Sequence, residues 1–555
     1  MSKALWVAVP AFLILLTACA PGNVPSAGAP QGQQQVSNEP KRGGYLRHLL
    51  PYSPQNLDPY TTEEPTGYGF IVRQWFEPLV SLEYKPGEDW RIGQKVIPWL
   101  AESWTKEGDR TYVFKLRKDA KFNTGDPMTA KDVVYSYSRL LDPNEKINPQ
   151  VRLNAEPLES VTAVEEYTVR LVSKTADPDS LINLSDYRIP VMSSKFVESG
   201  GDITKQVVGT GPFKLNSYRK DAEGVAVRNE YYWQRGKPYL DGVKYTLKVD
   251  DSTMAAAVTA GQADILMRND KTQFQPLQAA NPKLKSDRAV VNQIYSININ
   301  AGKAPLNDQR VRRAIFLALD RQELDKGLTF QEGTLSMPLV SAIRKDWSIS
   351  PEEILKQPGY RTPHDQDVTE AKRLLAEAGQ SSGFKTTIMY QTGFGFTPQA
   401  SEAVQAQLKK YLNIEAELLP LENPAYTPKR TAGQFDMVVE SASVVDRPAS
   451  YARTYFHSAG IYSKGAGIND PEVDRLVEAQ GTEFDSAKRS DLFKQLQKVL
   501  AEKAYTVPLP QATLYAIWQP WVHDWSDNRA NRQTVMNPWQ IWMDLNEAPA
   551  DRKQP

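Results

Sequence analysis

Alternating apolar and polar residues mark strands at intervals along the chain. The stretches TYVFKLR (111–117), VKYTLKV (243–249), IYSININ (294–300) and FKTTIMY (384–390) share this pattern. A two-residue period is typical of a strand with one buried face. Helical patterns lie between these stretches, so strands and helices interleave along the chain. The pattern therefore predicts a fold of the α/β or α+β class.

Apolar residues recur at the spacing of a buried helix face in residues 129–143, 308–324 and 367–379. In the first segment Thr129 is suited to cap a helix, and Asp132 stands in the capping-box position. We therefore expect three helices over these ranges.

The third of these segments carries both a start and a stop signal. Asp367 and Glu370 form a predicted capping pair, and Gly379 is a typical terminating glycine. Elsewhere, GTGPFK (209–214) has two glycines of a nucleotide-binding G-x-G-x-x-G pattern but lacks the third. We interpret it as a tight turn before a strand.

The N-terminal residues have the pattern of a targeting segment. The apolar run ALWVAVPAFLILL (4–16) follows Lys3 and is too short for a comfortable membrane span of about 20 residues. LTAC then leads to Cys19, the single cysteine of the chain, and resembles the bacterial lipobox. We expect a signal peptide over 1–18 and lipidation of Cys19.

Residues 19–40 contain little that a folded core could bury. They are rich in Pro, Gly, Ser, Gln and Asn, a composition that does not offset the entropy cost of ordering. We expect this segment to be a disordered tether between the lipidated cysteine and the folded protein. The protein would then be extracytoplasmic, in the periplasm or at the cell surface, and anchored to a membrane.

Composition narrows the choice of function. Lys+Arg and Asp+Glu number 66 each, so the net charge is zero and there is no electrostatic footprint for nucleic acid. One cysteine excludes an intramolecular disulfide or a CxxC pair. Aromatic residues are plentiful, with 12 Trp, 25 Tyr and 17 Phe, and can line a binding cleft as well as a core.

Catalytic and metal-binding patterns are weak. The four histidines are far apart and form no HExxH pair, so we expect no metal site and no cofactor. GQSSG (379–383) matches the G-x-S-x-G nucleophile elbow around Ser381, which requires a strand before the serine and a helix after it. Here the predicted order is reversed. We therefore expect a binding protein, with a serine hydrolase as a less favoured alternative.

Several ordered segments resemble the family 5 extracellular solute-binding proteins of ABC importers, which include peptide and nickel binders. The resemblance runs from about residue 43 to about residue 545. It is carried by residues 98–140 (PWLAESWTKEGDRTYVFKLRKDAKFNTGDPMTAKDVVYSYSRL), 209–218 (GTGPFKLNSY), 228–243 (RNEYYWQRGKPYLDGV), 307–321 (NDQRVRRAIFLALDR), 371–379 (AKRLLAEAG) and 509–518 (LPQATLYAIW).

The resemblance implies an α/β fold of two hinged lobes, a periplasmic-binding-protein or Venus-flytrap fold with an extra subdomain inserted in lobe I. The implied segments are lobe I over 41–296, its inserted subdomain over 76–205, lobe II over 297–510, a lobe I return over 511–548 and a tail over 549–555. The solute would bind between the lobes and favour the closed state through contacts with both.

The resemblance also implies a place for the solute. In the family's oligopeptide binders, a W-x-x-D-x-x-x-P loop supplies an aspartate that pairs with the peptide α-ammonium, a charge-assisted bond. Aligning Pro448 with the proline of this pattern puts Ser441 at the tryptophan and Val444 at the aspartate. Glu440 or Asp446 could substitute. A peptide or peptide-like solute remains the first expectation, and an oligosaccharide, an opine or a metal chelate is the alternative.

The resulting candidate ligand-binding residues come from the first lobe crossing and this loop, with three weaker aromatic candidates. We also expect an ABC permease as partner, no nucleic acid partner, and a monomer. The candidates are Tyr295, Asn298, Glu440, Ser441, Ser443 and Asp446, followed by Tyr68, Tyr390 and Phe394.

Overall fold

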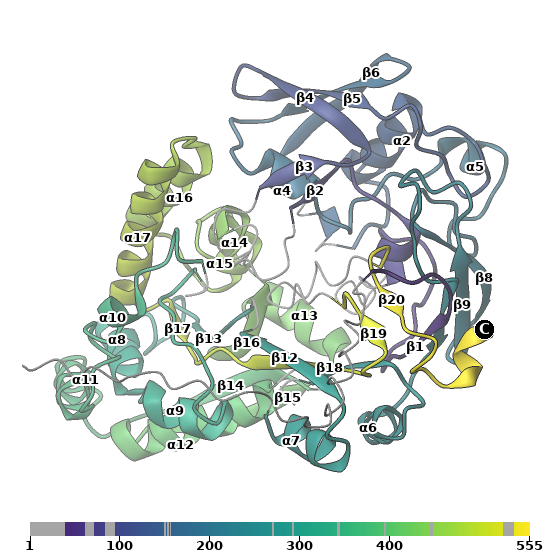
Figure 1. Cartoon of the computed structure of the whole chain (residues 1–555). Coiled ribbons are helices and arrows are strands. Elements are labelled where there is room, and N and C mark those ends of the chain that lie inside the picture. Colours follow the sequence, from purple (N-terminus) through teal and green to yellow (C-terminus); the bar gives the residue numbers. More distant parts are fainter. Residues whose placement is uncertain are drawn as a thin grey trace, which may run out of the picture. The chain divides into compact units, whose positions relative to one another are not determined.

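Among its described residues, the computed structural model has sheets of seven, five and four strands and two sheets of two strands each, with helices packed on the larger sheets (Figure 1). It describes residues 39–61, 71–83, 95–148, 151–152, 155, 157–268, 271–290, 293–340, 344–392, 396–443, 448–525 and 538–555.

One sheet has seven strands and gathers segments from both ends of the chain. β1 pairs in parallel with β10 and β11, and β18 pairs antiparallel with both β11 and β12. In spatial order the strands are β12 (Lys285–Val290), β18 (Thr513–Trp518), β11 (Ile265–Arg268), β1 (Tyr45–Leu49), β10 (Gly242–Thr246), β9 (Glu223–Arg228) and β8 (Phe213–Arg219).

Helices α6 (Asp251–Thr259) and α7 (Lys271–Ala280) share a small apolar core with β11 and β18. The C-terminal segment also joins this part of the chain: β19 (Val522–His523) pairs with β20 (Trp542–Met543), and the 3-10 turn η1 (Ala550–Lys553) lies against β1.

A four-stranded antiparallel sheet is inserted between β1 and β8 in the sequence. It shares one apolar core with the seven-stranded sheet. We call the seven-stranded and four-stranded sheets with their helices lobe I. The inserted elements are β2 (Val80–Leu82), β3 (Val96–Pro98), β4 (Ala101–Glu107), β5 (Thr111–Leu116), α2 (Ala130–Leu141), β6 (Leu158–Glu165), β7 (Thr168–Ser173), α4 (Ser180–Leu184) and α5 (Ser194–Glu198).

Lobe II is built on a five-stranded sheet. Its strands, in spatial order, are β15 (Glu415–Leu421), β14 (Lys385–Gln391), β16 (Met437–Ser443), β13 (Gln293–Ile299) and β17 (Thr506–Pro508). Side chains alternate between the two faces along each strand, so Val439 and Ile297 belong to one apolar core, whereas Val438 and Ile294 belong to another.

Helices cover both faces of this sheet. The Val439 face packs against α8 (Gln309–Ala318), α9 (Arg321–Leu328), α10 (Pro351–Ile354), α11 (Asp365–Glu377) and α12 (Thr397–Leu412). The Val438 face packs against α13 (Asn423–Thr431), α14 (Pro448–Tyr455), α16 (Pro471–Thr482) and α17 (Ser486–Lys503), and α15 (Ile461–Gly465) lies against α13 and α14.

Among the described elements, the chain passes between the two large sheets twice. It passes from β12 to β13 and later from β17 to β18. The predicted lobe boundary after residue 296 falls inside β13, and all of β13 pairs in the lobe II sheet. In sheet membership, the chain therefore changes lobes between β12 and β13. The other predicted segment bounds remain predictions.

The predicted helices form, with two corrections. α2 begins after Thr129, whose backbone N–H donates to the Asp132 carboxylate at 2.8 Å, as the capping box requires. The predicted helix over 308–324 is instead two helices, α8 and α9. Asp320 lies between them and its side chain accepts from the backbone N–H groups of Gln322 and Glu323, so it caps the second helix.

The second correction concerns α11. This helix begins at Asp365, before the predicted capping pair. Asp367 is buried inside it and accepts hydrogen bonds from the guanidinium of Arg361, so it does not cap the helix. The predicted stop is confirmed, since Gly379 follows the helix with a φ of +74°.

The GTGPFK segment forms the predicted turn before β8. Its glycines allow two backbone segments to approach closely. A Cβ on Gly209 would lie 2.0 Å from the carbonyl oxygen of Trp75, and one on Gly211 would lie 2.5 Å from that of Gln74. The turn therefore fixes Thr210 next to residues 74–77.

Candidate ligand-binding site

In each lobe, the carboxyl ends of the parallel strands lie on the side where the chain crosses between the lobes. In lobe II, β14, β15 and β16 are parallel and β13 is antiparallel to them, so the carboxyl ends of the parallel strands share an edge with the start of β13. In lobe I, β1, β10 and β11 end on the side where β12 leaves and β18 returns. Ligands of open α/β sheets bind at the carboxyl ends of the strands. The topology therefore places the candidate site between these two edges.

Two predicted site residues, Asn298 and Glu440, contact each other directly. The Asn298 side-chain amide donates to Glu440 Oε1 at 2.6 Å, and the Tyr426 hydroxyl donates to Oε2 at 2.9 Å. Arg430 completes the set with three bonds of 2.8 to 3.2 Å from Nε and Nη2. We call Asn298, Tyr426, Arg430 and Glu440 the Glu440 network.

The Glu440 network is buried and electrically paired. Glu440 is 9% exposed, and Arg430 lies over the rings of Phe435 and Tyr462. Burial acts to lower the pKa of Arg430, but the Glu440 carboxylate outweighs it and raises the pKa. Burial and the same carboxylate hold the pKa of Tyr426 well above its usual value. The Glu440 carboxylate therefore already has a cationic partner in Arg430. A contact between this carboxylate and a solute ammonium stays a prediction.

Three other predicted residues lie on the opposite face of the lobe II sheet. Tyr295 is 2% exposed and stacks on Phe396 with 3.9 Å between ring centroids. Ser441 is the cross-strand partner of Tyr295. Tyr390 belongs to the same apolar core as Tyr295. The β alternation therefore divides the predicted set between the two faces of the sheet.

Among Tyr295, Ser441 and Tyr390, Ser441 differs in its buried polar atom. Its Oγ is buried and has no hydrogen-bond partner among the described residues. A buried hydroxyl without a partner is costly, so a solute or water that bonds to it would be stabilised. Ser443 is the last residue of β16, and its side chain is not among those that the structure describes. Cys19, Tyr68, Phe394, Val444 and Asp446 lie outside the described residues.

The structure shows a buried carboxylate that the sequence did not indicate. Glu77 is 2% exposed and accepts hydrogen bonds from Trp99, Tyr232, Trp233 and Thr210, at 2.9 to 3.3 Å. Burial raises the pKa of Glu77 to about 7, against the lowering effect of all four bonds. We call these five residues the Glu77 network. An acidic residue inside the apolar stretch WFEPLV is the signal that could have drawn attention to it.

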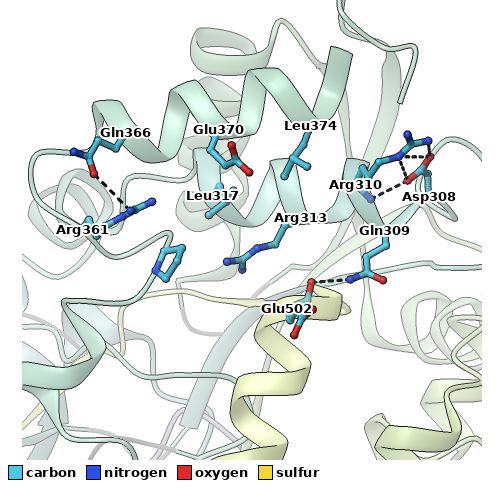
Figure 2. Close-up of a pocket in the computed structure, with 11 residues that line it drawn as sticks. Asp308, Gln309, Arg310, Arg313, Leu317, Arg361, Gln366, Glu370, Leu374 and Glu502 are labelled. Atoms are coloured by element: carbon cyan, nitrogen blue, oxygen red, sulfur yellow. Dashed lines mark hydrogen bonds and ion pairs between the residues drawn. The ribbon is translucent and has the colours of Figure 1, made fainter. Parts of the chain in front are cut away.

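A groove of about 820 Å³ lies elsewhere on lobe II, between α8, α11 and the end of α17 (Figure 2). Two of its arginines are engaged by side chains nearby, since Arg310 pairs with Asp308 at 2.6 Å and Arg361 bonds to Gln366 and Asp367. None of the predicted site residues lines this groove. The groove is therefore separate from the candidate site at the strand ends.

The alternative chemistries find no support in the geometry. Ser381 is exposed in a turn after α11 and before β14, the reverse of the strand–serine–helix order that a nucleophile elbow needs. Within the described ranges, no group of three His, Cys, Asp or Glu side chains is arranged to hold a metal ion.

Comparison with known proteins shows which family the chain resembles. The profile of "Bacterial extracellular solute-binding proteins, family 5 Middle" matches residues 95–463. The di/tripeptide-binding protein 3 of Pseudomonas aeruginosa is 27% identical over 508 residues, which cover 85% of this chain and 90% of that protein.

Solved structures show the same fold. The periplasmic binding protein DppA from Helicobacter pylori, in complex with the peptide STSA, aligns with a TM-score of 0.75 and 21% identity over 91% of this chain and 98% of its own. AgaA of Agrobacterium tumefaciens R10, in complex with agropinic acid, aligns with a TM-score of 0.72 and 22% identity over 90% and 99%. The two-lobed α/β fold expected from the sequence is confirmed, and the chain belongs to the family 5 bacterial extracellular solute-binding proteins.

Proposed function

We propose that this protein is an extracytoplasmic receptor that binds a peptide between its two lobes and delivers it to the permease of an ABC importer. The observation that carries the proposal is the similarity to a di/tripeptide-binding protein over most of both chains. The strand-end topology supports it, because both lobes present strand ends beside the segments that connect them. We further propose that the receptor acts as a monomer and has no catalytic activity.

A peptide is well matched to this kind of site. Its backbone N–H and C=O groups can bond to polar groups at the strand ends, such as the unpartnered Ser441 Oγ. The family's ammonium-binding aspartate position holds Val444. We therefore propose that backbone and side-chain contacts contribute more to peptide affinity here than a direct carboxylate–ammonium pair does.

Peptide binding is expected to stabilise the protein against heat. A ligand present at 100 times its Kd stabilises the folded state by about 2.7 kcal/mol. For a protein of this size, we expect di- to pentapeptides to raise Tm by a few degrees in a thermal-shift screen. Oligosaccharides, opines and metal chelates form the comparison set. A shift with one of these and none with peptides would contradict peptide specificity, and turnover of an ester or peptide would contradict the receptor role.

We also propose that Cys19 carries a lipid anchor. No helix in the described part of the chain has the length and apolarity that a bilayer crossing requires. The lipobox-like LTAC sequence supports processing at Cys19 followed by acylation, and two or more acyl chains make membrane binding stable where one is marginal.

Replacing Cys19 by serine should move the protein from the membrane fraction to the soluble fraction. Because residues 20–40 separate Cys19 from the folded part, peptide affinity of the purified variant should equal that of the native protein. Fractionation with immunoblotting and titration calorimetry measure the two quantities. A Cys19→Ser protein that stays in the membrane fraction would contradict the anchor, and a loss of peptide affinity would mean that Cys19 belongs to the binding site.

A further inference from the structure

A buried ion pair joins the lobes at a site distant from their connecting segments. Asp179 precedes α4 in the lobe I insertion, and Arg489 lies in the first turn of α17 in lobe II. Arg489 Nη1 and Nη2 donate to Asp179 Oδ1 and Oδ2, each at 2.6 Å. The two residues are 2% and 5% exposed. This is a bidentate, desolvated contact between parts of the chain that have separate apolar cores.

The partners of Arg489 hold its guanidinium in place. Its Nε donates to the carbonyl oxygen of Gln480 at 3.0 Å, and its Cζ lies 5.2 Å from the centroid of the Trp347 ring. On the other side, the backbone N–H of Asp179 donates to Asp177 at 2.9 Å. Burial acts to lower the pKa of Arg489, but Asp179 outweighs it and raises the pKa. The Asp177 carboxylate also acts electrostatically on Arg489 and raises the pKa of its guanidinium.

A second contact borders the ion pair. Lys106, at the end region of β4 in lobe I, places its Nζ 3.3 Å from the ring centroid of Phe484. Phe484 lies in the short loop between α16 and α17, and Arg489 follows it. The tip of the α16–α17 hairpin therefore contacts lobe I through one buried and one exposed interaction.

The position of this contact relative to the crossings is set by α17. Arg489 lies at the start of the helix, and the crossing strand β17 follows its end at Lys503. At 1.5 Å per residue, these points are about 20 Å apart. In Figure 1, β17 lies beside one end of α17, and β4 and α4 lie toward the other. A hinge motion at the crossings would therefore separate Arg489 from Asp179.

We propose that Asp179 and Arg489 form a latch that closes only when the lobes close. This inference rests on the proposed function, because it assigns the latch to the retention of the bound solute. When the lobes open, both charged groups return to water. When one partner is missing, closure buries the other charge without compensation, which disfavours the closed state. Removing one partner should therefore speed solute release, whereas replacing both with apolar residues should preserve closure.

The test compares four variants of the full mature chain: Asp179→Asn, Arg489→Gln, the pair Asp179→Leu with Arg489→Met, and the control Arg188→Gln. Arg188 forms a buried ion pair with Asp186, two residues away in lobe I. Peptide Kd and dissociation rate are measured with the peptide that stabilises the native protein most. We expect each single variant to weaken binding about 30-fold or more, mainly through faster dissociation. The apolar pair should stay within about threefold of the native protein, as should Arg188→Gln.

Small-angle scattering of the unliganded proteins gives a readout that needs no solute. Both single latch variants should have a larger radius of gyration than the native protein, and the apolar pair should not. If the folded single variants have the radius of gyration and the peptide affinity of the native protein, the latch proposal is wrong. If the native protein binds no peptide, the proposed function fails, but the scattering comparison still decides whether the latch exists. Thermal denaturation of each variant identifies any that is unfolded, and the other single variant then carries the comparison with the apolar pair.

Discussion

Replacing Arg430 by methionine should destabilise the protein by about 3–5 kcal/mol, the usual cost of removing one partner from a buried ion pair. The substitution leaves the Glu440 carboxylate buried with only Tyr426 and Asn298 as donors. It also removes the cation that lies over Phe435 and Tyr462. Chemical denaturation by urea, followed by tryptophan fluorescence, measures the loss.

Two further variants make this result specific to the charge. Lys429 is the exposed neighbour of Arg430 on α13, and Lys429→Met should change stability by less than about 0.5 kcal/mol. Combining Arg430→Met with Glu440→Leu should recover most of the loss, because apolar residues can replace a buried pair at little cost. A loss below about 1 kcal/mol in Arg430→Met would show that the Glu440 network does not hold an ionised pair.

Replacing Glu77 by glutamine should remove a large part of the pH dependence of stability. The pKa of Glu77 is raised by burial from about 4.5 to about 7 in the folded protein. Between these pH values the folded state binds more protons than the unfolded state, so stability falls as pH rises. The contribution is fully present below pH 4.5 and is lost as the pH rises through 7. The pKa difference corresponds to about 3 kcal/mol.

The quantity to measure is the stability of the native protein minus that of Glu77→Gln, from pH 4 to pH 8. This difference should fall as the pH rises, because the glutamine keeps an uncharged group of the same shape beside Thr210 and the two indoles. Glu166 is exposed, and Glu166→Gln serves as the control, with a flat difference. A flat difference for Glu77→Gln would mean that Glu77 keeps an ordinary pKa in the folded state.

Local patterns predicted the fold well where the local signal and the tertiary structure agree. The alternation at 111–117, 243–249, 294–300 and 384–390 corresponds to β5, β10, β13 and β14. The sequence does not indicate the break between α8 and α9, because apolar spacing continues through residues 318–324. The side-chain bonds of Asp320 show that a new helix starts there.

The candidate site was less predictable, because its polar groups find partners across the sheet. Asn298 and Glu440 lie in separate segments of the sequence, and their direct bond depends on the β13–β16 register. The pairing of Glu440 with Arg430 comes from the packing of α13 on the same face. The stretch WFEPLV marks the Glu77 carboxylate itself, but its donors are spread from residue 99 to residue 233, and no local pattern indicates them.

The sequence alone does not predict the contact between Asp179 and Arg489 either. Asp179 and Arg489 are 310 residues apart, and each stands in a segment whose local pattern suggests an ordinary helix start. Their contact is a consequence of how the lobes meet. A family resemblance can indicate that two lobes close, but the groups that touch on closure depend on tertiary structure.

The most direct test of the central claim is native mass spectrometry of the protein purified from the medium or membranes of its own cells. A receptor for peptides should carry an added mass that is released on collision and fragments into amino-acid residues, and removal of that mass should restore peptide binding. An added mass that fragments as a sugar or an opine would contradict peptide specificity. A protein with no added mass and no affinity for any peptide tested would contradict the account.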